Sequence, residues 1–138
     1  MAVPSRKALP SNIDGWLSYI QTIHSRSIDL TLERVRRVAH CMKLAPTGPV
    51  MTVAGTNGKG SVCAMLESIY RAAGYKTGLF TSPHLVSFRE RIQVNREPIP
   101  EAEVVRLTEC MQALLRQFPA EQLPTFFEVI TVMALDHF

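Results

Sequence analysis

A glycine-rich turn between two apolar segments is the feature that most constrains how this sequence can fold. It lies in the stretch "VMTVAGTNGKGSVCAML", residues 50–66. The run "VMTVA" is short, β-branched and apolar on both faces, which favours a strand buried inside a parallel sheet. Apolar residues then recur at helical spacing, namely Val62, Met65, Leu66, Ile69 and Ala73. Gly74 is placed to end this helix, and residues 76–82, "KTGLFTS", resemble a second strand. The order predicts a βαβ unit.

The remaining elements are expected to be mainly helical. Periodicity predicts helices over about residues 11–24, 31–43, 99–118 and 125–138, with a small extended excursion over residues 88–99. Residues 1–12 are expected to form a flexible tail, and residues 13–138 to form one unit. Because two confident core strands make a poor sheet, we expect the chain to be the front part of a longer protein.

Composition excludes several classes of protein. The chain has 138 residues, 46% of them hydrophobic and 20% charged, as expected for a folded soluble domain. No apolar run approaches the ~18 residues of a membrane span, and no secretory signal is visible. The expected compartment is therefore the cytoplasm, with no membrane partner. Three widely spaced cysteines argue against a disulfide framework or a zinc site.

The net charge of +3 does not by itself indicate a nucleic-acid partner. Arg34, Arg36 and Arg37 lie in "TLERVRRVAHCM", where the apolar residues fall at helical spacing. A solvated basic helix face explains these arginines without nucleic acid, because no aromatic-interleaved motif accompanies them.

The turn "GTNGKGS" predicts phosphate binding. A glycine-rich turn after a buried strand and before a helix points backbone N–H groups and the helix dipole at one spot. Gly55, Gly58 and Gly60 have no Cβ to obstruct a phosphate. Lys59 adds a mobile charge, and Ser61 could hold a metal ion or a phosphate oxygen.

The match to the usual P-loop pattern is imperfect. The first glycine of GxxxxGK[ST] would fall on Val53, and Lys59 is followed by Gly60 instead of serine or threonine. An exposed turn is the alternative, since "NGKG" is ordinary turn chemistry. The flanking strand and helix favour phosphate binding.

Three further segments carry candidate functional residues. "TSPHL", residues 81–85, follows the second predicted strand, where ligands gather in open α/β sheets, so Ser82 could offer a hydroxyl to magnesium. Spacing alone favours a simple turn there. In "SIDL" and "TFFE", Asp29 could cap a helix, Glu128 could be a first-turn charge, and the phenylalanines are more typical of a core.

The combination of these motifs resembles a known family. "TVAGTNGKGSVCAMLESIYRAAGYKTGLFTSPHLVSFRERIQVN", together with "WLSYIQTIHSRSIDLTLERV", "EPIPEAEV" and "TFFEVITVMAL", resembles the folylpolyglutamate synthase/dihydrofolate synthase family of the Mur ligase superfamily. The likeness covers nearly the whole chain from Trp16. Mur peptide ligases share the glycine loop but not its companions.

The resemblance implies an α/β fold: a P-loop-containing, Mur-ligase-like nucleotide-binding domain with a mainly parallel sheet flanked by helices, incomplete in this chain. It implies an ATP-dependent ligase that activates a dihydropteroate or folate carboxylate as an acyl phosphate, which L-glutamate then attacks. The implied cofactors are ATP and Mg²⁺. The complete enzyme is expected to be a monomer, and these 138 residues alone are expected to be inactive.

The resemblance also assigns residues. The expected ATP-binding loop comprises Gly55, Thr56, Asn57, Gly58, Lys59, Gly60 and Ser61, with Lys59 as the catalytic residue. Ser82 matches the family's magnesium-binding serine, and Ser61 is a second candidate metal ligand. The segments matched to pteroate contacts are Ile28, Asp29, Leu30 and Thr31, and Thr125, Phe126, Phe127 and Glu128. The family often has glycine where Thr31 stands.

The family's remaining magnesium ligands, its carbamylated lysine and its glutamate-binding C-terminal domain would lie beyond residue 138. Two alternatives remain open at this point. One is another P-loop enzyme, such as a small-molecule kinase or a Mur peptide ligase. The other is a truncated, non-catalytic nucleotide-binding module.

Overall fold

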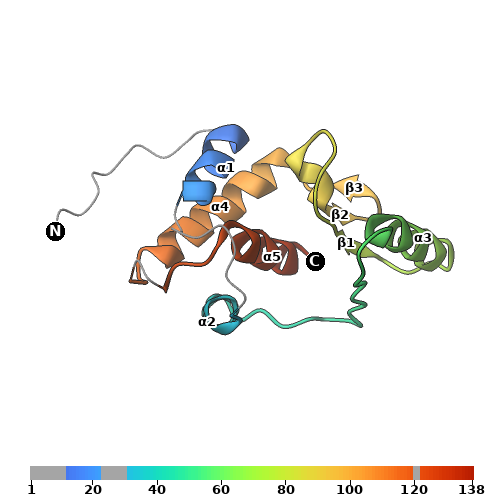
Figure 1. The fold of residues 1–138 in the computed structure, drawn as a ribbon, viewed down its shortest axis with the longest axis horizontal. Coiled ribbons are helices and arrows are strands. Elements are labelled where there is room, and N and C mark those ends of the chain that lie inside the picture. Colours follow the sequence, from blue (N-terminus) through green and yellow to red (C-terminus); the bar gives the residue numbers. More distant parts are fainter. Residues whose placement is uncertain (1–11, 23–30, 120–121) are drawn as a thin grey trace.

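The chain folds into a group of helices joined through a small sheet to one outlying helix (Figure 1). The structure, a computed structural model, describes residues 12–22, 31–119 and 122–138. Its elements in chain order are α1 (Ile13–Thr22), α2 (Glu33–Cys41), α3 (Lys59–Ala72), β1 (Gly78–Phe80), the 3₁₀ helix η1 (Phe88–Arg91), β2 (Ile92–Val94), β3 (Glu97–Pro98), α4 (Glu101–Leu115) and α5 (Phe126–His137).

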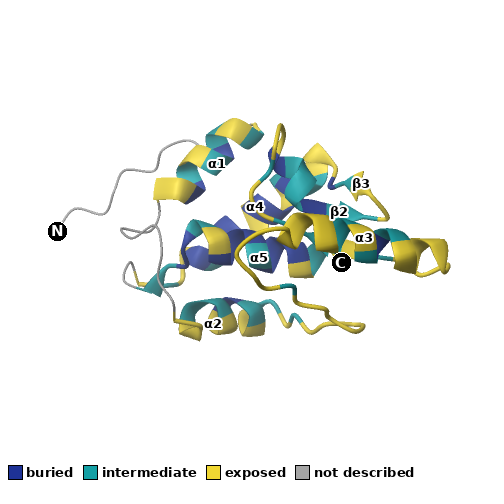
Figure 2. Cartoon of the chain, turned by 45° about the vertical axis from the view of Figure 1, so that its right-hand side comes forward, coloured by how far each residue is buried: buried dark blue, intermediate teal, exposed yellow. Residues whose placement is uncertain are grey.

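The hydrophobic core lies among α1, α2, α4, α5 and the sheet. Helix α5 is central, because it contacts α1, α2 and α4. Its Val129, Ile130 and Val132 are fully buried, as Leu107 of α4 is. Figure 2 shows this buried surface concentrated on α4 and α5. The predicted apolar faces of these helices are therefore largely confirmed, but Phe127 is 51% exposed, against the prediction that it is buried.

Local capping explains where two helices begin and end. The side chain of Asn12 accepts the Gly15 N–H at 2.8 Å and so caps the start of α1. Gly74 ends α3 with φ +89°, and the Tyr75 N–H donates to the Tyr70 carbonyl at 3.1 Å. This left-handed ending is the one that glycine favours.

The sheet differs from the prediction. It has three strands in the order β1-β2-β3, and both pairs are antiparallel. Asn95 and Arg96 join β2 to β3 with φ of 52° and 69°, the backbone of a tight two-residue hairpin turn. Such a turn reverses the chain at once, whereas a parallel pair needs a long crossover. The excursion predicted over residues 88–99 thus provides the second and third strands.

Residues 50–54 do not form the predicted strand. They adopt no regular structure, and Val50 and Met51 are 67% and 54% exposed. A strand exists through hydrogen bonds to a neighbouring strand, and no strand among the described residues pairs with this segment. The predicted βαβ unit is therefore wrong for the sheet seen here, although α3 and β1 both form.

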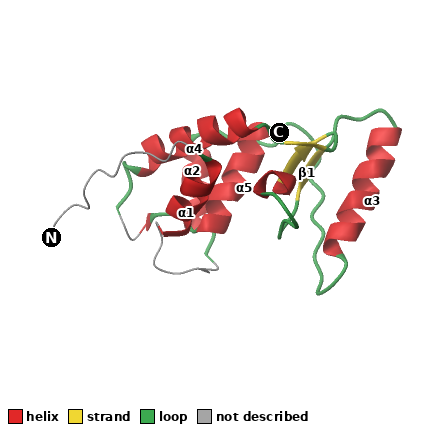
Figure 3. Ribbon diagram, turned by 90° about the horizontal axis from the view of Figure 1, so that it is seen from above, coloured by secondary structure: helices red, strands yellow, loops and turns green. Residues whose placement is uncertain are grey.

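Helix α3 lies on the other side of the sheet from the remaining α-helices (Figure 3). It presents Met65 and Ile69 to solvent, each more than half exposed. Its buried side chain is instead Glu67, which accepts from Thr77 Oγ1 at 3.0 Å. Arg96 Nε lies 2.9 Å from Glu67 Oε2 as an ion pair without hydrogen-bond geometry. The joint between α3 and the sheet is thus largely polar.

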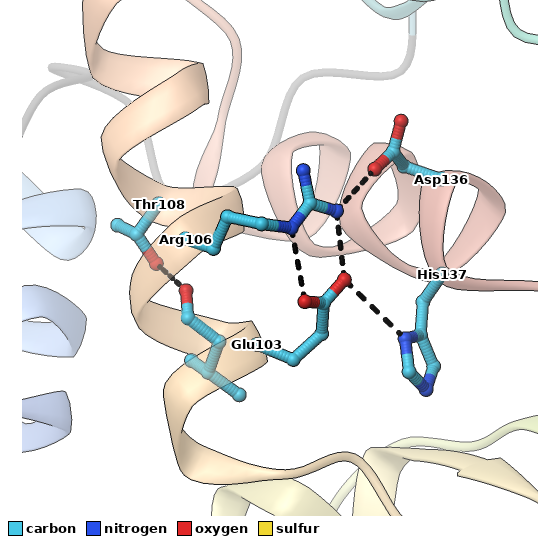
Figure 4. A network of polar contacts seen from close by, with 6 residues as sticks. Glu103, Arg106, Thr108, Asp136 and His137 are labelled. Atoms are coloured by element: carbon cyan, nitrogen blue, oxygen red, sulfur yellow. Dashed lines mark hydrogen bonds and ion pairs between the residues drawn. The ribbon is translucent and has the colours of Figure 1, made fainter.

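A polar network also joins α4 to α5 at the surface (Figure 4). Arg106 donates to Glu103 at 2.7 Å and to Asp136 at 3.0 Å. The hydrogen bond from Arg106 holds the pKa of Glu103 below its usual value. Pairs of this exposure contribute little stability individually.

The three cysteines are free, as the sequence suggested. Among the parts of the chain that the structure describes, no helix is long and apolar enough to cross a membrane.

Candidate functional site

The glycine-rich loop has backbone conformations that favour glycine at two positions. Gly55 and Gly58 have φ of 153° and 77°, in the region that side chains disfavour. Gly58 is the N-cap of α3, and its carbonyl accepts the Val62 N–H at 3.0 Å. The preceding N–H groups of the first turn have no helical acceptor, so they and the helix dipole can attract an anion.

Lys59 folds back over this loop. Its ammonium donates to the Gly55 carbonyl at 2.6 Å and to the Thr56 carbonyl at 3.1 Å. The loop therefore concentrates positive charge and exposed N–H groups, and its side chains are exposed. This arrangement suits an anionic ligand whose oxygens would replace the carbonyls as acceptors.

The segment after β1 is held by Arg91. The Nη1 of Arg91 donates to Ser82 Oγ at 3.1 Å, and its Nε donates to His84 Nδ1 at 2.8 Å. A cis peptide bond joins Ser82 to Pro83. Partial burial lowers the pKa of Arg91 from its ordinary value. Ser82 is therefore an exposed hydroxyl whose orientation is set by a neighbouring cation.

Glu90 holds the next part of the same loop. Its carboxylate accepts the backbone N–H groups of Leu85, Val86 and Ser87 at 3.0, 3.2 and 2.8 Å. The hydrogen bond from Leu85, followed by that from Ser87, lowers the pKa of Glu90. The loop thereby holds Leu85 and Val86 at 93% and 89% exposure.

The segment Thr125–Glu128 forms the start of α5. Thr125 and Glu128 make a reciprocal capping box, in which the Thr125 N–H donates to Glu128 at 2.7 Å. Arg34 of α2 also donates to Glu128, at 3.2 Å. Phe126 is partly buried against the core, as the general preference of phenylalanine suggested. Phe127 instead stacks on Phe80, with 5.8 Å between ring centroids.

The structure brings two of the predicted segments together. The guanidinium of Arg91 lies 5.8 Å from the ring centroid of Phe126, so the loop bearing Ser82 adjoins the first turn of α5. Thr31 lies two residues before the start of α2, whose Arg34 contacts Glu128. Ile28, Asp29 and Leu30 lie outside the described residues. Among the described contacts, no hydrogen bond or ion pair joins the glycine-rich loop to Ser82 or to α5.

Sequence reasoning missed Arg91 and Arg34. Nothing in "FRERI" distinguishes Arg91 from Arg89, which donates to the Ile99 carbonyl instead. Arg34 looks like one of several arginines on a solvated face, yet its side chain is only 12% exposed. Only the packing of α2 and η1 against α5 identifies these two residues.

The described residues could supply only part of the coordination shell of a magnesium ion. They contain no group of three His, Cys, Asp or Glu side chains that could hold a metal ion. Ser82 offers one hydroxyl oxygen with a lone pair that Arg91 does not use. Magnesium commonly takes few protein ligands and completes its shell with phosphate oxygens and water. One serine beside a bound triphosphate is compatible with that chemistry.

Comparisons with known proteins agree on one family. No protein-family model matches the sequence. Over 93 residues the chain is 52% identical to the dihydrofolate synthase/folylpolyglutamate synthase of Escherichia coli, covering 67% of this chain and 22% of the relative. Over 130 residues it is 38% identical to the enzyme of the same name from Haemophilus influenzae, covering 93% and 28%.

Solved structures show the same likeness. An E. coli FolC structure in complex with DHPP and ADP matches with a TM-score of 0.80 and 43% identity, covering 94% of this chain and 30% of that one. A bifunctional folylpolyglutamate synthase/dihydrofolate synthase with Mn, AMPPNP and L-glutamate bound matches with a TM-score of 0.78 and 36% identity, covering 96% and 31%. Sequence and structure together place this chain in the dihydrofolate synthase/folylpolyglutamate synthase family, and it spans 22% and 28% of the length of the two relatives.

Proposed function

We propose that this chain is the nucleotide- and pteroate-binding part of an ATP-dependent ligase that adds L-glutamate to dihydropteroate, to folates, or to both. The observation that carries the proposal is the contact of the Ser82 loop with the first turn of α5 through Arg91 and Phe126. It puts a candidate metal-binding hydroxyl beside a candidate pteroate-binding segment. The related structures bind DHPP and ADP, and Mn, AMPPNP and L-glutamate, which supports the same ligand classes here.

The glycine-rich loop is proposed to hold the phosphates of ATP. The residues in this role are Gly55, Thr56, Asn57, Gly58, Lys59, Gly60 and Ser61. On binding, the ammonium of Lys59 would exchange the Gly55 and Thr56 carbonyls for phosphate oxygens. In the complete enzyme, residues 50–54 are proposed to pair with further strands in a mainly parallel, Mur-ligase-like sheet, because their apolar β-branched composition suits a strand covered on both faces.

The proposed reaction begins with attack of the substrate carboxylate on the terminal phosphorus of ATP, which forms an acyl phosphate and releases ADP. The amine of L-glutamate then attacks the acyl carbon and displaces phosphate. Negative charge accumulates during the first step, so Lys59 and the loop N–H groups stabilise its transition state. Mg²⁺, when bound near Ser82 with Ser61 as a second candidate ligand, supplies further neutralisation of that charge.

The pteroate part of the substrate is proposed to contact residues 28–31 and Thr125, Phe126, Phe127 and Glu128. The exposed ring of Phe127, fixed by Phe80, offers an apolar surface to a flat heterocycle. The approach of Arg34 to Glu128 supports this grouping, since it joins the helix that follows residues 28–31 to α5.

We further propose that residues 13–138 are one part of an ATP-binding domain, that the complete enzyme is a cytoplasmic monomer, and that the 138-residue chain alone does not complete the ligation.

Calorimetric titration of the purified chain with ADP tests the nucleotide site. We expect binding that Lys59→Ala weakens at least about tenfold, since it removes a charge-assisted contact. The control is Lys76→Ala, an exposed lysine outside the loop. Equal binding by the wild type and Lys59→Ala contradicts the proposal.

Activity is tested separately. The purified chain, supplied with ATP, Mg²⁺, dihydropteroate and L-glutamate, is expected to form no dihydrofolate. Product formation would refute the inactivity of the chain. A complete polypeptide containing these residues should release ADP only when both dihydropteroate (or a folate) and glutamate are present. Release with another acceptor alone would favour a different P-loop enzyme.

A further inference from the structure

Arg91 contacts both the Ser82 loop and the first turn of α5 through its side chain. Its guanidinium donates to Ser82 Oγ at 3.1 Å and to His84 Nδ1 at 2.8 Å, and it lies 5.8 Å from the Phe126 ring centroid. One planar guanidinium therefore makes three contacts: two directed N–H hydrogen bonds and one approach to an aromatic ring.

The contact with His84 fixes a proton position. A guanidinium N–H can only donate, so Nδ1 of His84 must be the acceptor. In a neutral imidazole the proton is then on Nε2. Phe88 also neighbours the ring, at 6.5 Å between ring centroids in an edge-on arrangement. Arg91 therefore sets which nitrogen of His84 can donate, as well as where the ring points.

Glu90, the residue before Arg91, restrains the backbone of the same loop, residues 82–87. Glu90 holds the backbone N–H groups of Leu85, Val86 and Ser87, while Arg91 holds the side chains of Ser82 and His84. Two consecutive residues of η1 thus fix both halves of residues 82–87. Because β2 follows η1 directly, this restraint is anchored in the sheet.

We propose that Arg91 is a positioning residue that holds Ser82 and His84 in one orientation and couples their loop to the start of α5. The coupling rests on the proposed function, in which the two segments face the phosphate end and the pteroate end of one substrate complex. Binding of the pteroate part of the substrate at the start of α5 should then alter residues 82–87 through Arg91. Lysine keeps the charge but lacks the rigid fork that serves two acceptors at once, so Arg91→Lys should break the coupling without removing the cation.

The first test needs no ligand. Long-range ¹H–¹⁵N spectra of the ¹⁵N-labelled 138-residue chain at about pH 8 report the tautomer of neutral imidazole rings. In the wild type, we expect His84 to be protonated at Nε2 alone. In Arg91→Lys and Arg91→Gln, we expect a mixture of tautomers. The control is Arg96→Lys. It changes a half-exposed arginine in the turn between β2 and β3, which pairs with Glu67 of α3. A wild-type His84 protonated at Nδ1 overturns the proposal without any variant.

The second test adds dihydropteroate and follows backbone amide signals. In the wild type, signals of residues 82–87 should shift together with those of residues 125–128. In Arg91→Lys, signals of residues 125–128 should still shift, those of residues 82–87 should not, and affinity should fall by about threefold to tenfold. Loop shifts of wild-type size in Arg91→Lys would overturn the coupling. If the wild type binds no dihydropteroate, the proposed function and the coupling both fail, and the tautomer experiment still decides whether Arg91 positions His84.

Discussion

Arg34 and Glu128 meet although 94 positions separate them in the sequence. The Arg34 Nε lies 3.2 Å from Glu128 Oε2, and the two side chains are only 12% and 10% exposed. Glu128 accepts the Thr125 N–H as well. One carboxylate therefore closes the first turn of α5 and joins α2 to it.

Glu128→Gln should destabilise the chain by about 1–3 kcal/mol, because it removes the negative charge from an ion pair whose two side chains are largely buried. Glutamine at this position can still complete the capping box, so the loss reports the ion pair more than the cap. Urea denaturation followed by circular dichroism measures it. Glu109→Gln, on the exposed side of α4, is the matched control and should change stability by less than about 0.5 kcal/mol. Equal midpoints for both variants would contradict the role of the pair.

Alanine substitutions at two glycines of the glycine-rich loop should change stability in opposite directions. Gly58 has φ of 77°, and a Cβ added there would meet no atom within 4 Å. Gly58→Ala should therefore destabilise the chain only through its unfavourable backbone conformation, by about 1–2 kcal/mol. Gly60 lies inside α3 without a positive φ, and no atom is within 4 Å of a Cβ there. Gly60→Ala should therefore stabilise the chain by about 0.5–1 kcal/mol. Thermal melting of both variants checks the pair, and loss of stability in Gly60→Ala would show that the helix starts later.

The loop after β1 should loosen in acid through Glu90. Its pKa is lowered from 4.5 by the hydrogen bonds from Leu85 and Ser87, with a smaller contribution from the charge of His84. A lowered pKa means that the ionised carboxylate stabilises the folded loop. That contribution is present above pH 4.5 and is lost as pH falls through the lowered value.

Amide exchange of Leu85, Val86 and Ser87 as a function of pH, corrected for intrinsic exchange, measures this loosening. Glu90→Gln should remove the pH dependence at these three amides. Protection that stays constant in the wild type down to pH 2 would show that the carboxylate does not hold the loop.

Two isoleucines should differ sharply when shortened. Ile130 in α5 is fully buried, so Ile130→Ala should cost about 2–5 kcal/mol. Ile69 in α3 is 62% exposed, so Ile69→Ala should change stability by less than about 0.5 kcal/mol. Chemical denaturation of the two variants under one set of conditions checks this. A large cost at Ile69 would mean that its face is covered in solution.

The sequence predicted the helices well because each has an apolar face that a neighbouring helix covers. Val104, Leu107 and Met111 are buried as their spacing indicates. It predicted the sheet poorly because a strand depends on its neighbours, which periodicity does not identify. Residues 50–54 have the composition of a buried strand and no strand partner among the described residues.

The candidate site was predictable in part for a similar reason. A glycine-rich turn before a helix was recognisable from local sequence, and the positive φ of Gly58 is one that glycine adopts readily. The contacts of Arg91 with Phe126 and of Arg34 with Glu128 join segments distant in sequence, and local patterns carry no information about them. The assignment of Ser82 and Glu128 to ligands remains a prediction, which the binding experiments above address.

The polar contacts of Glu67 should make the two ends of the molecule respond differently to added salt. The helical core around α5 is held mainly by apolar packing, which added salt does not weaken. Helix α3 is tied to the sheet by Glu67 with Arg71, Arg96 and Thr77, where two half-exposed guanidinium groups are open to screening by ions. Rising ionic strength should therefore let α3, with the glycine-rich turn at its head, swing relative to an unchanged core.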